Sequence, residues 1–119
     1  MPTQREENER VALLQGTLDL LILKVLVLGP VHGQGIARAI QRQSDEVFFV
    51  DHGSLYLALQ RLEDAGLVSA EWGVSENNRK ARFYTLTAKG REELTAKTSQ
   101  WNKLASAMAR VLSPAAEEA

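Results

Sequence analysis

The sequence predicts a mainly α-helical fold with a small two-stranded β-hairpin and a long C-terminal helix. Apolar residues recur at three- and four-residue spacing before residue 66, alternate with polar residues between 68 and 86, and return to helical spacing after residue 87. A chain of 119 residues with 45% hydrophobic residues suits one domain of ordinary size.

The first expected helix spans residues 13–28 and is densely apolar. Gly16 or Thr17 can cap its start, and Gly29-Pro30 can stop it. Its leucines and valines are more numerous than one helix face can use. We therefore expect this helix to be buried on several sides, either at the centre of the domain or between this chain and another.

Two further helices are expected before residue 66. The second begins at residues 33–35 and ends near residue 44, and the apolar segment 47–50 links it to the third, over residues 51–66. On the third helix, Leu55, Leu59 and Leu62 form an apolar stripe, whereas the other faces carry hydroxyl, amide and guanidinium groups. These polar residues are Ser54, Tyr56, Gln60 and Arg61.

A β-hairpin is expected after Gly66, which is a suitable residue for ending the third helix. Residues 68–74 alternate in the period of a half-buried strand, and residues 80–86 form the second strand. The segment 75–79 contains two asparagines, residues that tolerate positive φ at a hairpin tip.

Thr87 can cap a final long helix that runs to about residue 112, where Ser113-Pro114 can end it. Its apolar residues recur at alternately three- and four-residue spacing over about three heptads, which favours helix pairing. This apolar seam consists of Leu94, Trp101, Leu104 or Ala105, Met108, and Val111 or Leu112.

The formal net charge of −1 argues against nucleic-acid binding, because domains that bind nucleic acid are often basic. The distribution of charge weakens that objection. Acids gather near both ends of the chain, whereas residues 79–91 contain five cations and no acid. The five cations are Arg79, Lys80, Arg82, Lys89 and Arg91.

Several classes of protein are disfavoured. The chain has no cysteine, and no apolar run approaches the roughly 20 residues that span a bilayer. Residues 1–10 are too polar and acidic for a secretory signal, so we expect a cytoplasmic protein without a membrane segment. His32 and His52 stand beside glycines at helix starts and are interpreted as capping or turn residues. Without a recognisable ligand spacing or catalytic motif, we expect no metal, no cofactor and no enzymatic activity.

The order of three helices and a hairpin is that of a winged helix-turn-helix domain. A helix fits the DNA major groove, and a hairpin with a basic tip can reach an adjacent groove or the phosphate backbone. The start of the third helix can also approach a phosphate. The candidate DNA contacts are Gly53, Ser54, Tyr56, Gln60, Arg61, Arg79, Lys80 and Arg82.

Each of these candidates has a simpler explanation. Ser54 suits a helix cap, Tyr56 suits a half-buried packing residue, and Gln60 and Arg61 suit a solvated helix face. The basic run is the stronger indication of DNA binding, because an ordinary solvent-exposed surface does not explain five cations without one acid.

Several short motifs occur in the order typical of one known family. They are LQGTLDLLIL at 14–23, GPVHG at 29–33, GSLY at 53–56, EWG and SENNR within 71–79, and YTLTAKG at 84–90. In this combination, the chain closely resembles the PadR-like transcriptional regulators over about residues 13–94. Members commonly have proline after the tyrosine and histidine three residues further on. Leu57 and Gln60 stand there instead, so the register on DNA is expected to differ.

The resemblance implies a cytoplasmic homodimer that binds a double-stranded DNA operator and usually represses transcription. Residues near the start of the chain lack apolar periodicity, so we expect a flexible N-terminal arm over 1–12, a winged helix-turn-helix DNA-binding domain over 13–90, a dimerisation helix over 91–112 and a flexible tail over 113–119. Some small members bind aromatic ligands between tryptophans at the dimer interface, so Trp101 is a candidate ligand contact as well as a packing anchor. The expected interface residues are Leu18, Leu21, Val25, Leu94, Trp101, Leu104, Met108 and Val111.

Two functions from different classes follow. The first is a sequence-specific, homodimeric repressor that a small aromatic ligand can release. The alternative is a winged-helix interaction module that pairs through its final helix and has no DNA role. The acidic net charge and the altered third helix favour this alternative.

Overall fold

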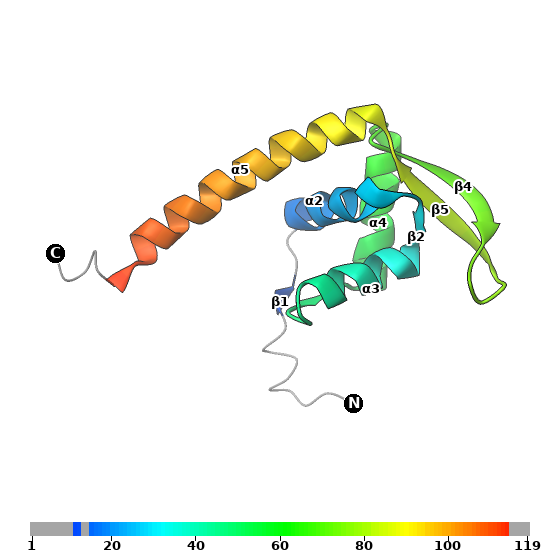
Figure 1. Ribbon diagram of the computed structural model, residues 1–119, viewed down its shortest axis with the longest axis horizontal. Coiled ribbons are helices and arrows are strands. Elements are labelled where there is room, and N and C mark those ends of the chain that lie inside the picture. The colour runs from blue at the N-terminus through cyan, green and yellow to red at the C-terminus, as the bar shows by residue number, and fades with distance from the viewer. Residues whose placement is uncertain (1–10, 13–14, 115–119) are drawn as a thin grey trace.

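The computed structural model describes residues 11–12 and 15–114, and the helices α2 (Gln15–Val25), α3 (Gly33–Gln43) and α4 (His52–Asp64) pack together at its centre (Figure 1). Their apolar side chains meet in one core together with those of the short helix η1 (Leu26–Leu28). The apolar stripe predicted on the third helix is confirmed, because its three leucines are buried. The largest fully buried residues are Ile22, Leu23, Leu26, Ile36, Leu55 and Leu59.

The first helix differs from the prediction at its start. Because α2 already begins at Gln15, Gly16 and Thr17 lie inside the helix and do not cap it. The stop is as expected: η1 is followed by Gly29, whose φ of 144° is a conformation that favours glycine. Leu18 is only 4% exposed and belongs to the core. Leu18 therefore offers little surface for the dimer contact predicted from the sequence, which stays a prediction.

The hairpin has the predicted bounds, β4 (Val68–Val74) and β5 (Lys80–Leu86), in antiparallel register. Asn78 has a φ of 57° at the tip, as its position suggested. A short strand, β2 (Val31–His32), adds to the other edge of β5 and gives the order β2-β5-β4. The sequence did not reveal β2, because two residues are too few to show an alternation.

The expected N-terminal arm is described only in its last two residues. These form β1 (Val11–Ala12), which pairs in parallel with β3 (Phe48–Phe49) in the link between α3 and α4. The rest of the arm, residues 1–10, and the tail residues 115–119 lie outside the described part of the chain.

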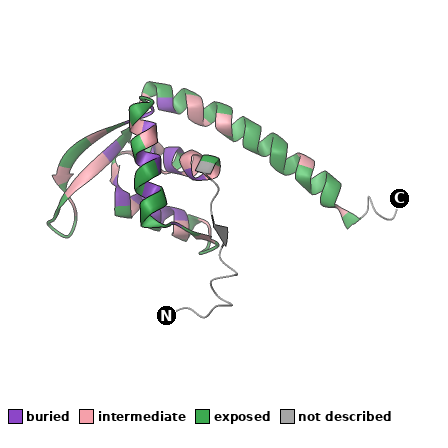
Figure 2. Cartoon of the chain, turned by 180° about the vertical axis from the view of Figure 1, so that it is seen from behind, coloured by how far each residue is buried: buried purple, intermediate pink, exposed green. Residues whose placement is uncertain are grey.

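The final helix, α5 (Ala88–Leu112), starts where predicted, because the Thr87 hydroxyl accepts a hydrogen bond from the Gly90 N–H at 3.0 Å. Its first turns pack beside α2, and the rest extends away from the other helices with an almost entirely exposed surface (Figure 2). Gly90, in the first turn of α5, is buried against the segment between α4 and β4, and a Cβ there would collide with the Leu67 carbonyl oxygen. The α5 helix therefore leaves the domain in a direction that the close contact at Gly90 helps to fix.

Candidate nucleic-acid interface

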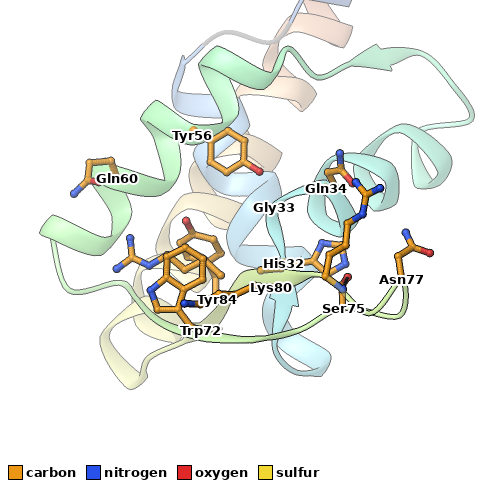
Figure 3. Close-up of a pocket in the computed structure, with 13 residues that line it drawn as sticks. His32, Gly33, Gln34, Tyr56, Gln60, Trp72, Ser75, Asn77, Lys80 and Tyr84 are labelled. Carbon is orange, nitrogen blue, oxygen red and sulfur yellow. Dashed lines mark hydrogen bonds between the residues drawn. The ribbon is translucent and has the colours of Figure 1, made fainter.

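A cleft of about 560 Å³ separates α4 from the hairpin (Figure 3). One wall carries the predicted candidates Tyr56 and Gln60 from α4, and the other carries Arg79, Lys80 and Arg82 from the hairpin. The structure thus brings together five of the eight predicted DNA contacts, whereas Gly53, Ser54 and Arg61 are not among the residues that line the cleft. The other lining residues are His32, Gly33, Gln34, Trp72, Ser75, Asn77, Ala81 and Tyr84.

The start of α4 is capped by an acid. The Asp51 carboxylate accepts hydrogen bonds from the Ser54 N–H at 2.9 Å and from the Ser54 hydroxyl at 3.1 Å. These bonds hold the pKa of Asp51 below its ordinary value. Because a carboxylate already occupies this N–H, it is unavailable to a phosphate unless Asp51 moves. Ser54 is thus the partner of the cap residue and not the cap itself.

On the cleft side of α4, Tyr56 and Gln60 are exposed. The ring of Tyr56 lies against the start of α3, so close that a Cβ on Gly33 would meet the Tyr56 hydroxyl at 2.7 Å. Gln60 donates a hydrogen bond to Asp64 at 2.9 Å along the same helix. The neighbouring Leu57 is 66% exposed, so its side chain is free to meet a partner surface.

Arg61 forms an ion pair with an acid on α2 and does not line the cleft. Its guanidinium donates to the Asp19 carboxylate on α2 at 2.9 Å, where Asp19 is largely covered. Sequence reasoning could not foresee this pair, because the two residues stand 42 positions apart. The interaction joins α2 to α4 and gives Arg61 a structural partner.

The cations of the hairpin differ in their partners. Arg82 donates to Glu63 on α4 at 2.9 Å, whereas Arg79 and Lys80 form no ion pair with any residue in the described ranges. Below them, burial raises the pKa of Tyr84, which keeps its phenol neutral. The cleft therefore holds two uncompensated positive charges beside neutral hydrogen-bonding groups.

Hydrogen bonds join the tip of the hairpin to the start of α3, through residues that carry no site signal in the sequence. His32 Nδ1 accepts a hydrogen bond from the Gly35 N–H at 3.1 Å, so Nε2 carries the ring proton and donates to Glu76 at 3.3 Å. Arg38 donates to the other oxygen of Glu76 at 3.3 Å. The expectation that His32 acts as a capping residue is confirmed.

The remaining members of the basic run lie outside the cleft lining. Lys89 donates to the Ala65 carbonyl at 2.8 Å and so satisfies the end of α4, while Arg91 is exposed on α5. Of the five cations predicted as an acid-free run, only Arg79, Lys80 and Arg82 on the hairpin line the cleft.

Apart from Leu18, which lies in the core, the predicted interface residues fall into two groups. Leu21, Val25 and Leu94 pack partly against the core. The others project from the free part of α5, where Trp101 is 45% exposed. This second group is Trp101, Leu104, Met108 and Val111. In the described residues, no helix is both long and apolar enough to cross a membrane.

Comparison with known proteins gives consistent matches. The sequence model of the transcriptional regulator PadR-like family matches residues 22–96. A transcriptional regulator from Clostridium thermocellum has a TM-score of 0.75 at 26% identity, covering 82% of this chain and 95% of that one. A PadR family transcription regulator from Clostridium difficile has a TM-score of 0.69 at 28% identity, covering 80% and 97%. Bacillus subtilis PadR in complex with operator DNA has a TM-score of 0.60 at 25% identity, covering 67% and 45%.

Proposed function

Because the chain belongs to the transcriptional regulator PadR-like family, we propose that it is a homodimeric repressor that binds operator DNA at the α4–hairpin cleft of each protomer. Family membership makes it a DNA-binding regulator of transcription. We propose three further features: which residues contact DNA, that two copies of the chain form a dimer, and that binding represses transcription.

The observation that carries the proposal is the pair of uncompensated cations in the cleft. Arg79 and Lys80 face the same space as Tyr56 and Gln60, at the side of a helix that can enter a major groove. In this arrangement the hairpin cations neutralise phosphates, and the α4 side chains meet base edges. Phosphate neutralisation by lysine and arginine also makes binding strongly dependent on salt.

The dimer is proposed to form through α5. Its last turns carry large apolar side chains that have nothing to pack against within the described chain, and their spacing fits helix pairing. Burying them against a second copy removes apolar surface from water and places two clefts in a fixed relation. Trp101 is the proposed packing anchor, since buried aromatic residues dominate such interfaces.

We also propose that a small aromatic effector releases the repressor by binding against Trp101 in this interface. A Trp72→Phe variant leaves Trp101 as the sole tryptophan, so its emission reports that position alone. Phenolic acids or planar cationic drugs are titrated into this variant to measure quenching, and into the parent protein bound to operator DNA to measure release. The proposal expects quenching beyond the inner-filter effect together with loss of DNA binding, and is contradicted if neither occurs.

The DNA proposal is tested by fluorescence anisotropy with labelled duplexes from the region upstream of the protein's own gene. The parent protein should bind one duplex at low salt more tightly than an unrelated sequence. An Arg79→Ala/Lys80→Ala variant should bind about tenfold more weakly, because two phosphate contacts are lost. Arg91→Ala removes one exposed cation outside the cleft lining and should bind like the parent. Equal binding by the double variant, or no binding to any upstream duplex, contradicts the proposal.

A further inference from the structure

Trp72 is a large aromatic side chain that the packing of the domain does not explain. Along β4 the side chains on one face become progressively exposed: Val68 is buried, Ala70 is half-buried and Trp72 is 65% exposed. Its indole lines the cleft and shares the antiparallel register position of Arg82 (Figure 3). An exposed indole in a cleft lined by polar groups is a candidate contact for a ligand.

The ammonium of Lys80 lies 5.0 Å from the centroid of the Trp72 ring. The ring quadrupole attracts a cation in this position. This contact restrains a flexible lysine chain, so that less conformational freedom remains to be lost when the ammonium meets an anion. Trp72 and Lys80 therefore present one apolar surface and one positive charge side by side, in a defined geometry.

The partner that fits this pair is determined by the charges around it. Glu63 is already occupied by Arg82, and Glu76 by His32 and Arg38, so neither acid compensates Lys80. A DNA backbone alternates apolar deoxyribose faces with phosphates and thus offers the same two kinds of surface in sequence.

We propose, building on the DNA-binding function above, that Trp72 and Lys80 act together as one backbone contact. The indole packs against a deoxyribose, and the ammonium pairs with the adjoining phosphate. Trp72 thereby becomes a DNA-contacting residue in addition to those predicted from the sequence.

The first test uses the emission of Trp72 alone. Trp101→Phe leaves Trp72 as the only tryptophan, and acrylamide quenching is measured with and without a saturating labelled duplex whose anisotropy reports binding. An exposed indole is readily quenched in the free protein, and the duplex should lower the quenching constant at least twofold. If the duplex is bound while quenching stays unchanged, this inference is overturned and the DNA-binding proposal stands. If the parent binds no duplex, both are overturned.

The second test uses variants of the parent chain. Trp72→Ala should weaken duplex binding by about tenfold, whereas Trp72→Phe, which keeps a ring beneath the ammonium, should recover part of the loss. Ser69→Ala changes an exposed residue on the opposite face of the same strand, outside the cleft lining, and should leave binding unchanged.

A double-mutant cycle separates a joint contact from two independent ones. Trp72→Ala should cost less affinity in a Lys80→Ala background than in the parent, because each residue depends on the other. Melting curves of the free proteins check that the variants fold. Parent-like affinity of a folded Trp72→Ala protein, or equal costs in both backgrounds, contradicts the joint contact.

Discussion

His32 at the start of α3 donates a hydrogen bond to Glu76 at the tip of the hairpin, with 3.3 Å between Nε2 and Oε2. The two residues stand 44 positions apart, and Arg38 binds the second oxygen of the same carboxylate. The position of the hairpin relative to the helices is thus held at its tip as well as at its base. Because the hairpin carries the cleft cations, this connection affects where they meet DNA.

Glu76→Ala should therefore weaken operator binding by about threefold to tenfold, since the hairpin must be ordered as DNA binds. Anisotropy titrations measure the affinity, and melting curves of the free protein should change little, because Glu76 is exposed. Glu71→Ala, which removes the same charge from an exposed position of β4 outside the cleft lining, serves as the control. Unchanged affinity in Glu76→Ala would show that the connection does not set the hairpin position.

The ion pair between Asp19 and Arg61 should contribute to stability rather than to sequence preference. Urea unfolding of Asp19→Asn, Arg61→Ala and the double variant should give a coupling free energy of about 0.5–1 kcal/mol. The relative affinities of Arg61→Ala for operator variants should match those of the parent. A relaxed preference at one base pair would instead restore the direct reading role predicted from the sequence.

Glu63→Gln should strengthen DNA binding. In the free protein Glu63 neutralises Arg82, so its removal frees a third cation in the cleft lining. The slope of log K against log salt should steepen by about one. Glu92→Gln on α5, which makes the same charge change outside the cleft lining, should leave the slope unaltered. Identical slopes for both variants would place Arg82 away from the phosphates.

Lowering the pH should reduce the free energy of unfolding, partly because the Asp51 carboxylate becomes protonated. Its pKa is lowered by hydrogen bonds from Ser54, so its contribution is present above the ordinary aspartate pKa of about 4 and is lost as the pH falls through the lower folded-state value. Asp51→Asn retains a side-chain oxygen for the cap but cannot titrate. Its free energy of unfolding should fall less than that of the parent between neutral pH and the acid range below about pH 4. Parallel pH profiles would exclude a contribution from Asp51.

Gly90→Ala should destabilise the chain by about 1–3 kcal/mol, because the added Cβ meets backbone that cannot give way easily. Gly16→Ala is the matched control, since nothing lies within 4 Å of a Cβ at that position of α2. That change should be neutral or slightly stabilising, as alanine favours a helix. Thermal unfolding compares the two, and equal melting temperatures would mean that the contact at Gly90 is not tight.

Local signals predicted much of this fold. The caps at His32 and Thr87, the tip at Asn78 and the strand bounds each depend on residues within a few positions of one another. Asp51 was also detectable, because it stands three residues before Ser54 in the spacing of a helix cap.

Tertiary partners could not be predicted in the same way. Residues 79–91 contain no acid, yet Glu63 of α4 neutralises Arg82 once the chain folds. Asp19 likewise removes Arg61 from the set of free cations. The exposure of Trp72 depends on how far the hairpin extends beyond the helices, which the alternation along its strand does not determine.

Two α4–hairpin clefts, held by paired α5 helices, are proposed to bind one operator. Hydroxyl-radical footprinting on the region upstream of the protein's own gene measures this arrangement. Two protected half-sites related by two-fold symmetry are expected, with centres about 10 base pairs or a multiple of that apart. A Leu104→Asp change in α5 should abolish joint protection of the half-sites while Lys103→Asp leaves it intact. A single asymmetric footprint that persists in Leu104→Asp would show that paired α5 helices do not place two clefts on one operator.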